Sequence, residues 1–325
     1  MCFYKENMEK NNGNELSVSE YDKISKQIKT LNILGISGGE PFLRKDLAEI
    51  IKIIHKNCKP LVIDLPTNGF FTDTIIEQTE EILKTIKDTI IDLQLSLDGP
   101  EFIHDEIRGI KGSFKNVKET YNRLLPLKEK YKNLRIKICT VYSSYNQKYM
   151  LELFDIIKKD FSNIDRFVFS AVHGSVQDKE SLNFDWEEYF KLCEIVDYSI
   201  NKEHKNDFHT IVTQAIRKIK NRFLKEVLSK HDMYKRCNAG KKVIVINEVG
   251  DVFPCEPLWW KIGNLRENDY NINDILNSFG MKVFLNNKRI NKCSCHWGLP
   301  MSNNILYSPK YYLPILFDVI KRKIS

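Results

Sequence analysis

The feature that most constrains the fold of this chain is a regular alternation of short apolar runs with stretches of helical periodicity across residues 32–172. The runs have the composition of strands, and the stretches between them place apolar side chains at helical spacing. The runs cover 32–37, 61–65, 90–97, 134–141 and 164–172, and the helical stretches cover 47–56, 75–86, 114–127 and 147–158. The alternation favours a parallel α/β sheet or barrel, in which ligand sites lie at the carboxyl ends of the strands.

The pattern changes in the second half of the chain. Two long helical stretches, 186–204 and 211–230, are followed by a hairpin at 242–246 and 251–254, a helical segment at 272–286 and an apolar, basic tail at 304–323. We therefore predict a barrel domain at 1–205, a helical bridge at 206–235, a small domain at 236–303 and a C-terminal tail at 304–325.

Composition narrows the class of protein. The 325 residues are 42% hydrophobic and 29% charged, as expected for a chain with a packed core. The net charge of +7 comes from lysines scattered among acids, which disfavours a nucleic-acid partner. The sequence has no apolar stretch long enough for a membrane span, and residues 1–14 are polar rather than signal-like. These features predict a cytoplasmic protein.

Polar residues follow the first two apolar runs. In Gly38-Gly39-Glu40-Pro41, the glycines permit close approach of the backbone to a ligand, and the carboxylate is an acceptor suited to an ammonium group. Asn68, in a Thr-Asn-Gly turn, would order such a site through its side chain. Taken singly, each segment is more typical of an ordinary turn than of a ligand site.

The third run ends in Leu-Ser-Leu-Asp-Gly-Pro and is followed by His-Asp and Arg-Gly. Ser96 and Asp98 are suited to ribose hydroxyls, and Arg108 is suited to a carboxylate, which a guanidinium holds with two hydrogen bonds. The alternative is a capped turn with a surface arginine.

Together, these motifs resemble the radical S-adenosylmethionine (radical SAM) superfamily. In that family a C-x3-C-x2-C loop after the first barrel strand binds a [4Fe–4S] cluster, and an aromatic residue follows its last cysteine. By this resemblance Cys2 is the third cluster cysteine and Phe3 the aromatic residue. The family's first strand and its other two cluster cysteines would come before Met1 and are not in this sequence. We therefore expect Met1 to be an internal methionine or the chain to be a fragment.

The resemblance implies an activity and roles for the motif residues. Three thiolates leave one iron open to S-adenosylmethionine, whose reductive cleavage gives a 5′-deoxyadenosyl radical that abstracts hydrogen from a peptide or small-molecule substrate. Flavodoxin or ferredoxin would donate the electron. The implied cofactor-binding residues are Gly38, Gly39 and Glu40 at the amino group, Ser96 and Arg108 at the carboxylate, and Asp98 on the ribose side, with Asn68 ordering the turn. Asn146 also matches a family feature.

The later cysteines resemble the SPASM/twitch extension of radical SAM enzymes. Cys237 precedes the hairpin and Cys255 stands at its end, with 17 residues between the two cysteines, and Cys293 and Cys295 form a C-x-C pair. Four thiolates suit one auxiliary [4Fe–4S] cluster, and they also suit structural zinc. We expect the other cysteines to be core residues: Cys58, Cys139 and Cys193.

The predicted fold is a partial (β/α)6 TIM-like barrel that lacks its first strand, with a small C-terminal β-hairpin and helix iron–sulfur domain. His173, after the last barrel run, is a weak catalytic candidate, because a histidine there is more often structural. One alternative function is an inactive, truncated binding module stabilised by a four-cysteine zinc or iron–sulfur site. A zinc-dependent hydrolase is disfavoured, since the sequence lacks a His-rich open site.

Overall fold

The computed structural model describes residues 13–174, 176–197, 208–230, 237–286 and 296–324. The chain divides into two compact units: Met1–Val172 with Gln177–Asp185, and His173–Val176 with Trp186–Ser325. The domain boundaries at 205, 235 and 303 stay a prediction. Among the described residues, no helix is long and apolar enough to cross a membrane.

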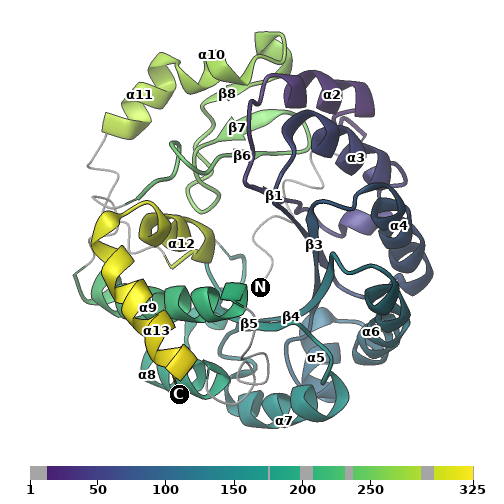
Figure 1. The fold of residues 1–325 in the computed structure, drawn as a ribbon, viewed down its shortest axis with the longest axis vertical. Helices are drawn as coiled ribbons and strands as arrows, with labels where there is room; N and C mark the ends of the chain where they lie inside the picture. Colours follow the sequence, from purple (N-terminus) through teal and green to yellow (C-terminus); the bar gives the residue numbers. More distant parts are fainter. Residues whose placement is uncertain (1–12, 175, 198–207, 231–236, 287–295, 325) are drawn as a thin grey trace. The chain divides into compact units, whose positions relative to one another are not determined.

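The first unit is built on five parallel strands that pair in chain order. Each strand pairs with the next one along the chain, so that successive βα units add to one side of a curling sheet (Figure 1). This confirms the predicted partial barrel. The strands are β1 (Ile33–Gly35), β2 (Val62–Thr67), β3 (Ile90–Ser96), β4 (Leu134–Tyr142) and β5 (Arg166–Ala171).

Helices cover the outer face of this sheet (Figure 1). Strand side chains alternate between faces, and the outward set, which includes Leu65, Leu93 and Ile138, is fully buried. Helix α2 begins at a capping box formed by Ser17 and Glu20. The sequence pattern predicted neither α2 nor α5. The helices are α2 (Val18–Lys26), α3 (Leu47–Cys58), α4 (Thr72–Thr85), α5 (Glu101–Arg108), α6 (Ser113–Lys130) and α7 (Met150–Asp160).

The inner face of the sheet carries charged side chains. Asp64 and Asp92 are register neighbours on β2 and β3, and Lys137 lies on β4. Lys137 is ion-paired with Asp92, and its Nζ atom is 3.4 Å from an Asp64 carboxylate oxygen. Asp92 and Lys137 are only 5% and 7% exposed. A buried ionic cluster therefore lies within the half-barrel.

The second unit combines helices with a small antiparallel sheet. The predicted hairpin is extended by a third strand, and the helix predicted at 272–286 breaks at Asn277, whose side chain donates back to the Asn273 carbonyl. Of the helical stretch predicted at 186–204, α8 covers Trp186–Ile195, and residues 198–204 lie outside the described residues. The strands are β6 (Val245–Ile246), β7 (Asp251–Phe253) and β8 (Gly263–Asn264), and the helices are α8 (Trp186–Ile195), α9 (Phe208–Lys230), α10 (Ile272–Leu276), α11 (Phe279–Asn286), α12 (Gly298–Leu306) and α13 (Tyr312–Ile324).

Candidate cofactor site and cysteine pair

Glu40 ties the loop after β1 to the turn after β2. One carboxylate oxygen accepts the Asn68 amide at 2.6 Å, and the other accepts the Phe42 amide at 3.2 Å, capping a short 3-10 helix at Pro41–Leu43. Burial raises the pKa of the Glu40 carboxyl, while the hydrogen bonds from Asn68 and Phe42 oppose that rise. The side chain of Asn68 closes its own turn by accepting the Phe70 amide at 2.8 Å.

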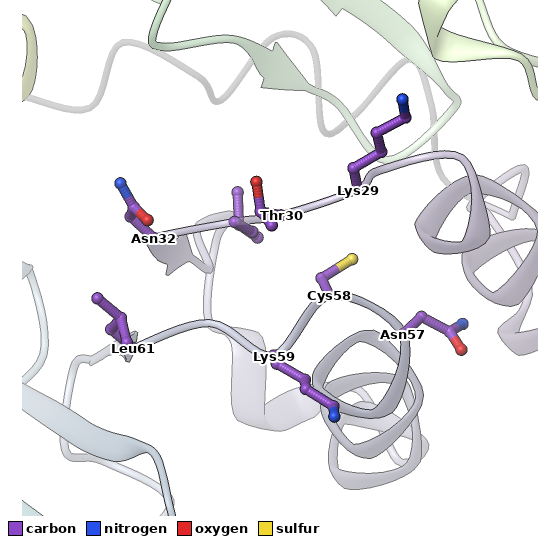
Figure 2. A pocket seen from close by; sticks show the side chains of 8 residues that line it. Lys29, Thr30, Asn32, Asn57, Cys58, Lys59 and Leu61 are labelled. Atoms are coloured by element: carbon purple, nitrogen blue, oxygen red, sulfur yellow. The ribbon is translucent and has the colours of Figure 1, made fainter.

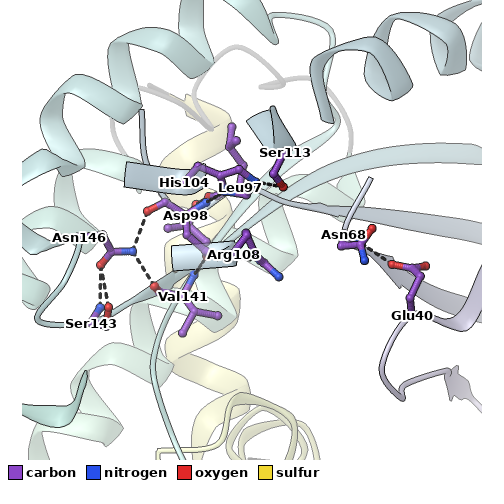
Figure 3. A network of polar contacts seen from close by, with 11 residues as sticks. Glu40, Asn68, Leu97, Asp98, His104, Arg108, Ser113, Val141, Ser143 and Asn146 are labelled. Carbon is purple, nitrogen blue, oxygen red and sulfur yellow. Dashed lines mark hydrogen bonds and ion pairs between the residues drawn. The ribbon is translucent and has the colours of Figure 1, made fainter. Parts of the chain in front are cut away.

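Asp98 and Arg108 form an ion pair at the carboxyl end of β3 (Figure 3). The Asp98 carboxylate is 1% exposed, receives the Val141 amide at 3.0 Å and lies 2.7 Å from an Arg108 Nη atom. Arg108 is the last residue of α5, where a cation interacts favourably with the helix dipole. Its Nε atom is buried and has no hydrogen-bond partner among the described residues. Arg108 thus keeps donor capacity beyond its bond to Asp98.

Two fully buried residues hold the Asp98 segment in place, and sequence reasoning gave neither a role. His104 Nδ1 accepts the Asp98 amide at 3.0 Å, and its Nε2 lies 3.2 Å from the Ser113 hydroxyl. Since Nδ1 is the acceptor, the proton of the neutral ring is on Nε2. Burial lowers the pKa of His104 to about 4. Asn146 donates to the carbonyls of Asp98 and Val141 at 2.7 and 2.8 Å.

These residues gather at one end of the strands. Arg108 extends from Asp98 toward Asn68 and Glu40 in Figure 3, and its charge lowers the pKa of Glu40. Ser96 is the half-buried last residue of β3. Gly38 and Gly39 are exposed just before Glu40. The structure therefore brings the predicted residues of the first unit to the carboxyl ends of neighbouring strands, apart from Cys2 and Phe3, which lie outside the described residues.

The arrangement fits an amino acid headgroup of the kind S-adenosylmethionine carries. A buried donor on Arg108 has no partner of its own, which suits an added carboxylate. Around Gly38, whose φ is +140°, the space that a Cβ atom would fill is open, so the backbone is accessible to a ligand. Glu40 supplies the negative charge that an ammonium group needs.

A separate pocket of about 450 Å³ lies at the opposite ends of the strands (Figure 2). It is lined by Asn32 and Leu61, which directly precede β1 and β2, and by Cys58 at the end of α3. The Cys58 thiol donates to the Ser25 carbonyl, and burial raises its pKa. A buried thiol of this kind is inert, and the pocket shares no lining residue with the candidate site.

In the second unit, Cys237 and Cys255 belong to one apolar cluster. Cys255 is buried with Ala239, Val243 and Trp297, and Cys237 packs against the same group. Cys237 Sγ accepts the Ala239 amide at 3.4 Å, a hydrogen bond of the kind that tunes cluster potentials. The remaining predicted metal ligands, Cys2, Cys293 and Cys295, lie outside the described residues.

Gly240 holds the backbone between these two cysteines in a left-handed conformation. Its φ is +74°, and its amide donates to the carbonyls of Val243 and Pro254 at 2.8 and 3.0 Å. An added Cβ atom would approach Pro254 Cβ to 3.1 Å, directly before Cys255. We expect Gly240→Ala to displace Cys255 and to lower the iron and sulfide content of the purified protein. Gly109→Ala, a left-handed glycine with open space around it, is the control for backbone strain alone.

His173 belongs to the second unit, where its ring centroid is 6.1 Å from that of His296. His296 in turn contacts the ring of Trp186 at 5.1 Å. The catalytic role of His173 stays a prediction. Cys193 is buried, as predicted, and burial raises the pKa of its thiol to about 12.

The comparisons with known proteins match both parts of the chain. The sequence model of the Radical SAM superfamily matches residues 1–130, and that of an iron–sulfur cluster-binding domain, SPASM, matches residues 237–296. Two sequence relatives are the antilisterial bacteriocin subtilosin biosynthesis protein AlbA of Bacillus subtilis and the AdoMet-dependent heme synthase of Methanosarcina barkeri.

AlbA is 25% identical over 78% of this chain, and the heme synthase is 26% identical over 79%. The match spans 52% of AlbA, about half its length, and 72% of the heme synthase. The fold is similar to that of native anSMEcpe solved with bound AdoMet and a peptide, with a TM-score of 0.56 and 18% identity over 99% of this chain and 91% of that one. This chain therefore belongs to the Radical SAM superfamily and carries a SPASM-type iron–sulfur cluster-binding domain on its C-terminal side.

Proposed function

We propose that this enzyme modifies a peptide by hydrogen abstraction and that it uses one auxiliary [4Fe–4S] cluster. The observation that carries the cofactor assignment is the buried, unpartnered Nε atom of Arg108 beside Asp98, at the same strand ends as Glu40. The peptide class is supported by AlbA, a bacteriocin biosynthesis protein, and by the peptide bound in the anSMEcpe structure. The heme synthase relative makes a small-molecule substrate the second candidate.

In this proposal the chain's residues bind and orient the cofactor. Glu40, with the exposed backbone of Gly38 and Gly39, holds the amino group of S-adenosylmethionine. Arg108 and Ser96 hold its carboxylate, and Asp98 fixes the arginine. When bound, S-adenosylmethionine and a [4Fe–4S] cluster supply a carbon-centred radical that removes hydrogen from the substrate. Phe3 and Cys2 would lie at that cluster.

The auxiliary cluster would be held by the four cysteines of the C-terminal region. Cys237 and Cys255 pack in one cluster with Trp297, and Cys295 precedes Trp297 by two residues in the sequence. Four thiolates complete the ligation of a single [4Fe–4S] centre. The electron donor, of the flavodoxin or ferredoxin type, and the cytoplasmic location also stay predictions.

The test is cofactor binding by the full-length protein, expressed from the furthest upstream in-frame start and reconstituted without oxygen. We expect Arg108→Met to weaken S-adenosylmethionine binding about tenfold or more, because a charge-assisted hydrogen bond is lost. Arg108→Lys keeps the positive charge, so partial recovery of binding by this variant would show that Arg108→Met loses affinity rather than the fold. Arg44→Met is the matched control: Arg44 and Arg108 are 27% and 28% exposed, and each is paired with an aspartate.

The same preparation distinguishes the proposed function from its alternatives. Iron and sulfide analysis with electron paramagnetic resonance should find two clusters, one of whose signals changes when S-adenosylmethionine is added. Zinc in place of iron at the C-terminal cysteines, with no 5′-deoxyadenosine formed on reduction, would favour the binding module. Substrate screening should find a peptide rather than a tetrapyrrole as the hydrogen donor.

A further inference from the structure

Helix α13 is apolar on two opposite faces. Ile315 and Val319 pack against Ile211 and Ala215 of α9, forming one buried contact. A second stripe faces away from that contact and is exposed, with Leu313 77% and Phe317 79% accessible. The exposed stripe consists of Leu313, Leu316, Phe317 and Ile320, at the i, i+3, i+4, i+7 spacing of one helix face.

The exposed stripe is part of a larger group of exposed apolar side chains, not a single isolated surface residue. Leu306, Tyr307 and Tyr312 are also exposed just N-terminal to it, so large apolar side chains continue from the end of α12 into α13. Surface helices normally present one apolar stripe to the core and a polar face to water. Contiguous apolar patches of this kind mark interaction sites. We therefore expect another surface to cover the stripe.

The charged residues that precede and follow the stripe in the sequence are basic. The sequence has Lys310 before the helix and Lys321, Arg322 and Lys323 at its end. The single acid of the helix, Asp318, is turned to α9, where its carboxylate lies 3.0 Å from Lys218 Nζ and its side chain is 13% exposed. Thus no acidic side chain of α13 stands on the exposed apolar face, and the sequence around it is cationic.

We propose that this face of α13 binds an anionic phospholipid surface, with the helix lying in the plane of the interface. Apolar side chains on one face with lysine and arginine beside them are the combination that such helices use. Tyrosines at one end suit the headgroup level of the bilayer. The helix has 13 residues, too few to span a bilayer, for which about 20 are needed.

A second copy of the chain is the less favoured occupant. In a twofold contact the same patch is present on both subunits, so the cations of the two helices would be brought together. Like charges across an interface oppose association. An anionic lipid surface instead complements those cations and covers the apolar stripe at the same time. This inference is independent of the radical chemistry, since it involves no residue of the cofactor site.

The experiment is sedimentation of the full-length protein with vesicles. One set is phosphatidylcholine alone, and the other contains phosphatidylglycerol as well. We expect binding only to the second set, and weaker binding at high salt because the lipid charge is screened. Phe317→Ser should reduce the partition coefficient about tenfold or more, since a buried phenyl side chain is lost. Exchanging Lys321 and Lys323 for Gln should reduce it by a similar factor of about ten or more.

Phe279→Ser is the matched control. Phe279 is 81% exposed on α11, close to the 79% of Phe317, but it stands outside the stripe. It should leave vesicle binding unchanged, and thermal unfolding should show that all variants are folded. Absence of vesicle binding, equal binding to neutral vesicles, or full binding by Phe317→Ser would each overturn the proposal. A dimer that Phe317→Ser dissociates, without vesicle binding, would assign the stripe to a second copy.

Discussion

Lys137→Met is expected to lower the free energy of unfolding by about 3–5 kcal/mol, because it leaves buried carboxylates without a cation. Lys137 on β4 is ion-paired with Asp92 on β3 and also approaches Asp64 on β2, the next strand beyond. Asp92 is 5% exposed, and one of its carboxylate oxygens has no hydrogen-bond partner among the described residues. Urea denaturation at neutral pH measures the change.

Two variants separate charge burial from loss of packing. Lys137→Met combined with Asp92→Leu removes both charges of the close pair and should recover most of the lost stability. Lys128→Met removes a more exposed ion pair with Asp165, whose side chains are 25% and 29% accessible, and should cost about 1 kcal/mol or less. If Lys137→Met and Lys128→Met lower the free energy of unfolding equally, burial of the ion pair does not increase the cost of removing its cation.

The effect of Lys137→Met should also shrink as the pH falls. Burial raises the pKa of the Asp92 carboxyl, so the folded protein binds this proton more tightly than the unfolded chain does. Protonation then removes the uncompensated charge in the folded state. The deficit is therefore fully present at neutral pH and decreases toward acid pH.

His104 should make the protein lose about 3 kcal/mol of stability as the pH falls from about 6.5 to about 4. The folded-state pKa is lowered from 6.5 to about 4, chiefly by burial. The unfolded chain therefore takes up a proton below its own pKa while the folded protein still excludes it. The contribution is present above the unfolded pKa and is lost as the pH falls toward the folded pKa.

Carboxylates also titrate in this range, so the test is the difference between wild type and His104→Gln. Glutamine retains an acceptor for the Asp98 amide but has no ionisable group, and its stability profile should be flatter between pH values of about 4 and 6.5. His55→Gln, which removes a histidine paired with Asp88 at the protein surface, is the control. Parallel profiles for wild type and His104→Gln would mean that His104 is not the titrating group.

The parts of the fold that follow from local pattern were predictable. The five strands and the four longest flanking helices of the first unit come from apolar periodicity, and the turn motifs then place Glu40, Asn68 and Ser96 at strand ends. Two-residue β8 is too short to give a periodic signal, and polar α5 has only eight residues. Their positions depend on tertiary contacts.

The polar contacts within the site could not be predicted in the same way. Asp98 and Arg108 were assigned separate roles, but they form one ion pair across a strand end and a helix end. Lys137 has the pattern of a solvent-facing strand residue, and its carboxylate partners lie 45 and 73 residues away in sequence. Asn146 matched a family feature without a role, which its two hydrogen bonds to the β3 and β4 ends now supply.

Because the Glu40 carboxylate bridges the loop after β1 and the Asn68 amide, these two loops are crosslinked before any ligand arrives. A ligand that binds there does not have to order them, so the entropy of fixing the loops is lost during folding rather than during binding. Under the proposed function, the binding free energy of S-adenosylmethionine would then remain available for orienting its reactive bond. The Glu40 side chain thus joins the two loops into one preorganised surface.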